Sequence, residues 1–505
     1  MRILITSPGG LTGLLLRQPL LSVLLQHGHR LMLAVPERLA ALVPMAAPGA
    51  ETAFLPDGFS GGPGKPDFDA RLAALHEQAA RFGPELIVAG GRPPEPVEEA
   101  VARWFPEVPS VASLDDTPAP RGGAAAPFTR TVPVTRNEPE RSRYAALAAA
   151  VLGWHVELPR PSLVLDAETR ERGGQELARL GVDPAACWVV CAGHTGEAGV
   201  RNWKPEQWAD LLVSICRRHD LHLLFCGTPD EEPVNDQIRE LMGEARTRTA
   251  SLRRPGLDLP LLAGILSHAA GYIGRQCGPT YVAAALGKPV LTVAGAGDWP
   301  RSMVAAGRGA VLLRLVPCAG CGWDCHLSEP YCIRHIPVEE AAAEFDRLVA
   351  GDQEFRVRAL EPDRFLLHRI IEDAAESARR LKRLSADRIE RLERDNKALA
   401  RALEETRAGA HSLRESVSGL QKRAGELQAA LKRSEEELLD REFQVRDLTA
   451  KCESWQAEAK KLEKLVSALR QENSVPAPLG RMADLFRRGP LARLYAKLRP
   501  RRADD

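Results

Sequence analysis

The stretch Gly271–Gly295, GYIGRQCGPTYVAAALGKPVLTVAG, combines residue types that could hold an anionic ligand. A short apolar strand ends near Ile273, a loop from Gly274 to Pro279 contains two glycines, and a helix of small residues follows. Backbone N–H groups at the N-terminus of a helix attract negative charge. The pattern predicts a phosphate-binding loop, although turns of this kind also occur in proteins with alternating strands and helices that bind nothing there.

A second group of residues could bind a metal ion. Cys318, Cys321, Cys325 and Cys332 form a C-x-x-C-x-x-x-C pattern followed by a six-residue gap. Thiolates at such spacing suit a tetrahedral zinc ion or an iron–sulfur cluster. The spacing predicts a structural metal site, with zinc favoured over an iron–sulfur cluster. The alternative is two local disulfides or unbonded thiols.

The composition bounds the class of protein. A chain of 505 residues is too long for one core, so two or three domains are expected. The 68 basic and 67 acidic residues nearly cancel, which argues against nucleic acid as a partner held by bulk charge. No apolar run of about 18 residues occurs, and the N-terminus enters a strand pattern without a cleavable signal. We therefore expect a cytoplasmic protein without a transmembrane helix.

The elements that would position these residues alternate between strand and helix. The chain opens with a predicted strand over Arg2–Thr6, a glycine-rich turn at Ser7–Gly13, a helix over Leu14–His27 and a strand over Arg30–Val35. Alternation resumes after a proline-bracketed segment, LPRPSLVL, that reads as a linker. The pattern predicts an α/β protein with two Rossmann-like halves and a cleft between them. Further strands are expected at Leu86–Ala89, Val111–Leu114, Trp188–Cys191, Leu221–Cys226, Gly271–Ile273 and Val290–Val293, and further helices at Phe68–Phe82, Glu95–Trp104, Pro139–Leu152, Pro205–Arg217, Leu259–Ser267, Thr280–Leu286 and Val338–Val349.

Four blocks in the second half resemble glycosyltransferase family 9, the ADP-heptose:lipopolysaccharide heptosyltransferases. They are VVCAGHTGEAGVRNWKPEQWADL, LLFCGTPDEE, LPLLAGILSHAAGYIGRQCGPTYVAAALGKPV and the cysteine group in VPCAGCGWDCHLSEPYC. A looser likeness, GGLTGLLLRQPLLSVL, lies near the N-terminus. The resemblance covers roughly residues 1–350 and implies the GT-B fold, in which two Rossmann-like domains face a cleft.

The resemblance also implies a metal-independent sugar transfer from a nucleotide-sugar, with an ADP-sugar favoured as the donor. Backbone N–H groups, helix N-termini and basic side chains would stabilise the diphosphate as it leaves. Thr195 would supply a hydroxyl contact, Arg201 a basic phosphate contact and Glu231 a contact to the ribose. The donor-binding residues expected in this way are Thr195, Arg201, Glu231, Gln276, Cys277, Gly278, Pro279 and Tyr281.

Three positions depart from the family pattern. Gly13 stands where the family usually carries the Asp proposed as the base, and Gln276 and Tyr281 stand at its usual Asp and His positions. Glycine cannot accept a proton, and a tyrosine with an ordinary pKa of about 10 is a poor base at neutral pH. Either another acid such as Asp115 or Asp116 serves as the base, or the chain binds its donor without turnover.

From Ile389 onward apolar residues repeat every seven positions in two seams. One begins Ile389, Asn396, Leu403, and the other begins Leu392, Leu399. This repeat predicts a coiled coil, and an asparagine in the seam is typical of a parallel dimer. The tail after Pro478 is basic, with apolar residues that could form one face, which suits either a membrane-surface anchor or a basic partner-binding tail.

The expected organisation is a Rossmann-like acceptor domain at 1–157, a donor domain with the cysteine group at 158–352, a coiled coil at 363–473 and a basic amphipathic tail at 479–502. The expected function is transfer of a sugar, with heptose as one candidate, to a cell-envelope glycan or glycolipid. The alternative is a catalytically lapsed GT-B domain that binds sugar-nucleotides or acts as a scaffold. A homodimer and a peripheral contact with the inner membrane are the expected associations, and no cofactor is required for transfer.

Overall fold

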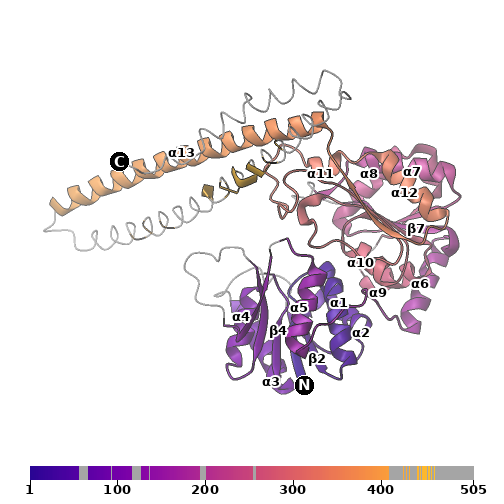
Figure 1. The fold of residues 1–505 in the computed structure, drawn as a ribbon, viewed down its shortest axis with the longest axis horizontal. Helices are drawn as coiled ribbons and strands as arrows, with labels where there is room; N and C mark the ends of the chain where they lie inside the picture. The colour runs from indigo at the N-terminus through magenta and orange to yellow at the C-terminus, as the bar shows by residue number, and fades with distance from the viewer. Residues whose placement is uncertain are drawn as a thin grey trace. The chain divides into compact units, whose positions relative to one another are not determined.

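A computed structural model describes residues 1–55, 66–92, 94–115, 127–135, 137–193, 201–253 and 258–408, with isolated residues between 425 and 460. The described chain divides into two compact units. The first comprises Met1–Asp324 and Pro330–Glu361, and the second comprises Cys325–Glu329 with the described residues from Pro362 onward. Both α/β halves belong to the first unit (Figure 1).

The first half forms a parallel sheet with the strand order β3-β2-β1-β4-β5-β6. The order reverses between β1 and β4, which in an open α/β sheet is the point where ligands bind at the carboxyl ends of strands. Its elements are β1 (Arg2–Thr6), α1 (Leu11–Gln26), β2 (Arg30–Pro36), η1 (Glu37–Leu42), α2 (Val43–Ala46), β3 (Glu51–Leu55), α3 (Pro66–Phe82), β4 (Leu86–Ala89), α4 (Pro96–Trp104), β5 (Ser110–Asp115), β6 (Arg130–Val134) and α5 (Glu140–Leu152).

Successive side chains of β1 pack on opposite faces of the sheet, so helices are needed to cover both faces. Ile3 and Ile5 join the buried cluster that contains α1 and α5 residues, whereas Leu4 joins the cluster that contains α3 and α4 residues. All three side chains are fully buried, because successive residues of a strand point to opposite faces. Figure 1 shows α4 and α5 on opposite sides of β4.

The second half forms another parallel sheet, in the order β13-β12-β11-β10-β7-β8-β9. Here the order reverses between β7 and β10. Its elements are α6 (Ala167–Arg179), η2 (Pro184–Ala186), β7 (Cys187–Cys191), α7 (Pro205–Arg218), β8 (His222–Phe225), η4 (Pro229–Glu231), α8 (Glu232–Leu241), η5 (Gly243–Arg248), β9 (Thr249–Ser251), α9 (Leu259–His268), β10 (Gly271–Arg275), α10 (Gly278–Ala285), β11 (Val290–Val293), η6 (Ala296–Asp298), β12 (Gly309–Arg314), α11 (Tyr331–Arg334), α12 (Val338–Val349) and β13 (Phe355–Leu360).

The two halves share one buried core. A single cluster of buried apolar side chains runs from α1, α2 and α5 of the first half to α9 and α10 of the second. Leu11, the first residue of α1, packs against Gly278, the first residue of α10, so closely that a Cβ at Gly278 would lie 2.5 Å from its Cδ2. A larger residue at this position would therefore have to displace the Leu11 side chain.

The predicted α/β class with two Rossmann-like halves is confirmed, and several elements have the predicted bounds. The strands Arg2–Thr6, Leu86–Ala89 and Val290–Val293 and the helix Val338–Val349 match the expectation. The predicted loop Gly274–Pro279 is wrong in extent, because β10 continues to Arg275 and α10 begins at Gly278. The elements not predicted are the strands β3, β6, β9, β12 and β13, the helices α2, α6, α8 and α11, and the short 3-10 helices.

The second unit is dominated by α13 (Arg364–Ala408), a continuous helix of 45 residues. Its start is joined to the segment Cys325–Glu329 by a hydrogen bond from the Ser328 hydroxyl to Asp373 (2.7 Å) and an ion pair between Arg369 and Glu329 (3.0 Å). The long helix agrees with the heptad pattern where the seams begin. Most of both seams and the basic tail lie outside the described residues, so the coiled coil, the tail and the domain boundaries stay predictions.

Among the helices of the described residues, none is long and apolar enough to cross a membrane.

The contact between α6 and α9 leads to a prediction for stability. A Cβ at Gly173 would lie 2.1 Å from the backbone carbon of Gly264, so Gly173→Ala should force the helices apart and lower the free energy of unfolding by about 1–3 kcal/mol. Gly174→Ala is the matched control, because its Cβ would meet only the ring of His268, at 3.3 Å. Urea unfolding followed by circular dichroism should show the control unchanged or stabilised. Equal stability of the two variants would contradict the packing argument.

Candidate functional site

The candidate site lies at the carboxyl ends of β7, β8 and β10, where the strand order of the second sheet reverses. The parallel registers pair Val189 with Leu224 and with Tyr272, so the three strands end at one edge of the sheet. The segments that follow these strands carry Gly193, Glu231 and the loop before α10.

A buried ion pair joins these three strand ends. Arg275, the last residue of β10, donates from Nη2 to Oε1 of Glu231 (2.5 Å) and from Nε to the carbonyl of Gly193 (2.8 Å). The side chains of Arg275 and Glu231 are 14% and 15% exposed. Burial by itself lowers the pKa of Arg275, but the interactions with the Cys277 sulfur and with the Glu231 carboxylate outweigh burial and raise it. The guanidinium thus stays charged and holds the three loops together.

Glu231 is also fixed from its own segment. Its Oε2 accepts the backbone N–H of Thr228 (2.9 Å), which caps the short helix η4. With one oxygen facing Arg275 and the other facing Thr228, the carboxylate has a defined orientation at the end of β8. The family resemblance assigns it a ribose contact, and that role stays a prediction.

The N-terminus of α10 is built from Cys277, Gly278 and Pro279. Cys277 is the N-cap residue, and its backbone N–H is 3.3 Å from the hydroxyl of Thr280. That hydroxyl also donates to the carbonyl of Arg275 (2.8 Å), which fixes the turn between β10 and α10. The positive end of the helix dipole therefore lies beside the charged Arg275, and both favour an anion.

Gln276 and Tyr281 bond to the same backbone atom. The Gln276 amide donates to the carbonyl of Ser302 (2.9 Å), and the Tyr281 hydroxyl donates to that carbonyl as well. Tyr281 is buried, and burial raises its pKa further above the ordinary value, so it stays a neutral phenol. These two side chains connect the turn before α10, and α10 itself, to the segment after β11. Neither side chain is suited to accept a proton.

Arg201 lies beside a tryptophan that comes from the cysteine-containing segment. Its guanidinium carbon is 4.9 Å from the centre of the Trp323 ring, within the range of a cation–π interaction. Trp323 in turn donates from its indole N–H to Oδ2 of Asp298 (2.6 Å). Trp203 and Trp208, which follow Arg201, are buried and pack edge to face, so they support α7.

Three sulfur atoms lie beneath this edge of the sheet. The sulfurs of Cys191 and Cys226, at the ends of β7 and β8, are 2.9 Å apart, and the Cys277 sulfur is 3.3 Å from the Tyr272 hydroxyl. Burial, followed by the bond to Cys226, raises the pKa of Cys191, and the bond to Cys191, followed by burial, raises that of Cys277. The thiols of Cys191 and Cys277 therefore stay protonated at neutral pH and are poor nucleophiles.

The metal site predicted at Cys318, Cys321, Cys325 and Cys332 has no support in the structure. Cys318 is buried and the other three are partly buried. Within the described residues, no group of three or more His, Cys, Asp or Glu side chains is arranged to hold a metal ion. Trp323, in the middle of this segment, has contacts that serve the fold around β11.

The carboxyl edge of the first sheet carries a buried acid, Glu98. It accepts the Thr6 hydroxyl (2.6 Å) and the backbone N–H groups of Gly90 (2.8 Å) and Gly91 (2.9 Å). Through these three hydrogen bonds, Glu98 holds the ends of β1 and β4 together.

Two further acids of the first half differ in environment. Glu140 is paired with Arg143 (2.5 Å) and Arg92 (3.1 Å), which leaves it a structural role. Burial, and then the charge of Glu98, raises the pKa of Glu95 at the N-cap of α4, the direction that a general base at neutral pH requires.

Of the sequence-predicted donor residues, the structure brings Glu231 and Gln276–Pro279 to one sheet edge, whereas Thr195 lies outside the described residues. The candidate base Asp116 and the side chain of Asp115 also lie outside them. Arg275 and Trp323 were missed. An arginine within the predicted loop Gly274–Pro279 was the signal for the first, and a tryptophan between glycine and aspartate within the cysteine group was the signal for the second.

The chain is similar to family 9 glycosyltransferases in sequence pattern and in fold. The model of Glycosyltransferase family 9 (heptosyltransferase) matches residues 99–306. A family 9 glycosyl transferase from Veillonella parvula DSM 2008 aligns with a TM-score of 0.57 and 15% identity, over 70% of this chain and 98% of its own. E. coli ADP-heptose lps heptosyltransferase II aligns with a TM-score of 0.52 and 14% identity, over 69% and 99%. These likenesses confirm the GT-B architecture. Among curated proteins, no match is found.

The Arg275–Glu231 pair generates a prediction that separates charge pairing from packing. Arg275→Met removes the cation beside the Glu231 carboxylate, and Glu231→Gln removes the anion beside the Arg275 guanidinium, so each should cost about 3 kcal/mol of unfolding free energy. The double variant removes both charges and should recover more than half of the summed loss. Denaturant titration of the four proteins measures the coupling, and additive losses would show that the pair does not act as a unit.

Proposed function

Since the chain is a glycosyltransferase of the family 9 type, we propose that it transfers a sugar from a nucleotide-sugar donor, with an ADP-sugar favoured, to a glycan or glycolipid acceptor of the cell envelope. Heptose is one candidate for the sugar. The single observation that carries the donor side is the charged edge of the second sheet, where Arg275, Glu231 and the N-terminus of α10 meet.

The chemistry required is a displacement at the anomeric carbon of the sugar. The acceptor hydroxyl forms the new C–O bond, the bond to the diphosphate breaks, and the nucleoside diphosphate leaves with the bonding electron pair. Arg201 and the backbone N–H groups before α10 are the groups proposed to stabilise the leaving charge. The proton of the acceptor hydroxyl goes to a carboxylate of the first half. Neither Gln276 nor Tyr281 takes that role, because both donate to Ser302.

A specific observation also favours a second candidate function. The two residues that replace the family's usual polar pair are engaged with the carbonyl of Ser302, so the donor side keeps its shape without its usual ionisable groups. The alternative is therefore a GT-B domain that binds a sugar-nucleotide without transferring the sugar.

Two associations belong to the proposal. The heptad seams beyond Ile389 support a homodimer, and the basic tail at 479–502 supports a peripheral contact with anionic lipid. The domain division at 157, 352 and 363 and the donor-binding roles of Thr195, Arg201 and Glu231 stay predictions.

Donor binding is tested by thermal shift with ADP-, GDP- and UDP-sugars. At a hundredfold excess over Kd the matching donor should stabilise the protein by about 2.7 kcal/mol, which raises the melting temperature. Arg201→Ala should weaken this effect, whereas Arg217→Ala, an exposed arginine at the end of α7, should not. No stabilisation by any of the nucleotide-sugars would count against both the enzyme and the binding module.

Turnover separates the two candidates. Incubation of the stabilising donor with envelope extract should release nucleoside diphosphate and label a glycan or glycolipid if the chain is a working transferase. Tight donor binding without transfer or donor hydrolysis would leave the binding module as the function.

The dimer is tested on the full chain by analytical ultracentrifugation. Replacing Ile389 and Leu392 together with Glu puts charges into both seams, and the sedimenting mass should fall from dimer to monomer. Arg391→Glu changes an exposed residue of the same turn and serves as the control. A wild-type monomer, or a double variant that remains dimeric, would refute association through these seams.

A further inference from the structure

Trp323 has an unusual backbone conformation. Its φ angle is +72°, and it is the one non-glycine residue with positive φ among those that the structure describes. The left-handed region is costly for a bulky side chain, on the order of 1–3 kcal/mol, and is kept where surrounding contacts demand it. Something in the surroundings of Trp323 must therefore stabilise this conformation.

The indole ring is seated on the segment that follows β11. A Cβ at Gly297 would lie 2.5 Å from the ring carbon Cδ2, and one at Gly295 would lie 2.6 Å from Cη2. The ring therefore rests against backbone at two glycines. The bond from its N–H to Asp298 (2.6 Å) fixes the rotation of the ring in this position.

Arg201 is the group that this seated ring holds. The guanidinium carbon lies 4.9 Å from the ring centre, while the residue itself is exposed. A cation over an aromatic face uses the charge of the guanidinium, whereas contact with a phosphate uses its N–H groups, so the two interactions are compatible. An arginine held in one orientation before the ligand arrives loses less side-chain entropy on binding.

We infer that Trp323 is a positioning residue for the donor diphosphate, and that it acts by holding the Arg201 guanidinium over its indole ring. The inference rests on the proposed function, because it takes the ligand of Arg201 to be the diphosphate of a nucleotide. It assigns the segment between Cys318 and Cys332 a part in donor binding that does not depend on a metal.

The probe is ADP, with its affinity measured by titration calorimetry on the full chain. Trp323→Leu should weaken ADP binding about five- to tenfold, the range expected when a partly desolvated cation–π contact is lost. Trp323→Phe keeps the ring and loses only the indole N–H, so its ADP affinity should lie between those of the wild type and Trp323→Leu. In the Arg201→Ala background, Trp323→Leu should cause no further loss, because the group that it positions is already gone.

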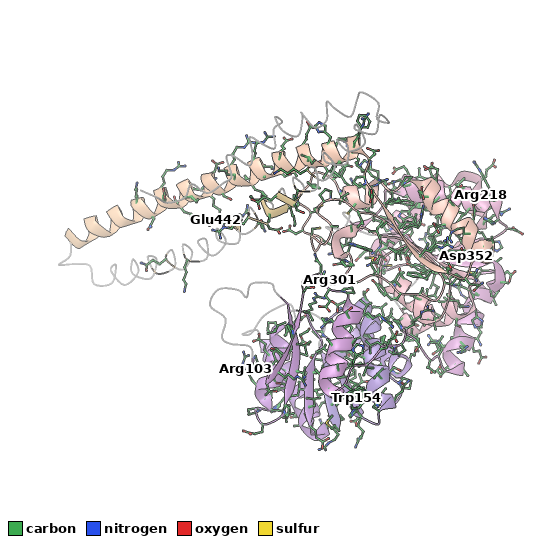
Figure 2. All side chains as sticks on the ribbon, viewed as in Figure 1. Arg103, Trp154, Arg218, Arg301, Asp352 and Glu442 are labelled. Carbon is green, nitrogen blue, oxygen red and sulfur yellow. The ribbon has the colours of Figure 1, made fainter. Side chains whose placement is uncertain are left out.

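A merely structural role is separated by a second ligand and a matched control. Adenosine lacks the diphosphate, so its affinity should not change in Trp323→Leu, whereas general damage to the donor half would weaken both ligands. Trp154→Leu replaces a 54% exposed tryptophan of the first half, labelled in Figure 2, and should bind ADP like the wild type. Should Trp323→Leu fail to fold, Trp323→Met takes its place in the same comparison.

The outcomes distinguish the two proposals. If the wild type does not bind ADP but binds another nucleotide, the ADP preference fails and the comparison is repeated with that nucleotide diphosphate. If the wild type binds ADP and Arg201→Ala weakens binding, but a folded Trp323→Leu or Trp323→Met binds ADP like the wild type, the positioning role is overturned while the proposed function stands. Equal weakening of ADP and adenosine would overturn it as well.

Discussion

The charged edge of the second sheet depends on one buried ion pair. Arg275 ends β10 and Glu231 lies in η4 after β8, 44 positions apart in sequence, yet their side chains meet at 2.5 Å with little exposure to solvent. Removing two charges from water costs several kcal/mol, and only close geometry with further hydrogen bonds offsets that cost. The bonds to Gly193 and Thr228 provide them, so the ends of β7, β8 and β10 are fixed relative to one another.

Much of the α/β alternation could be predicted from sequence, because buried parallel strands are short apolar runs between helices. That is why β4 and β11 were identified with their observed bounds. β13 was missed because its sequence, FRVRAL, alternates apolar and charged residues at an edge position. α6 was missed because two adjacent glycines weaken its helical signal, and their purpose is visible only where Gly173 meets Gly264.

The site was predictable in its location but not in its contacts. Sequence patterns and a family resemblance pointed to the strand ends, since ligand loops of open α/β sheets lie there. They could not show that Gln276 and Tyr281 both reach Ser302, nor that Arg275 faces Glu231. Such pairings depend on which loops of distant sequence meet. The metal site expected from cysteine spacing has no support among the described residues and stays a prediction.

Arg301, which precedes Ser302, connects the segment after β11 to the first half of the chain. The backbone N–H of Glu140, at the start of α5, donates to the carbonyl of Arg301 (2.7 Å), a residue labelled in Figure 2. One short segment after β11 therefore contacts α10 through Ser302, Trp323 through Asp298 and α5 of the first half through Arg301.

The shared core between the halves has a consequence for how this chain can change over evolutionary time. Leu11 fills the space above Gly278, and apolar side chains from α1, α2, α9 and α10 belong to one cluster. In a densely packed core, a change of side-chain volume in one half is tolerated only if side chains of the other half change to compensate for it. Neither half could be exchanged for the corresponding half of a relative unless the residues along this seam were exchanged with it. The two halves, although each is built on its own sheet, are thus inherited together.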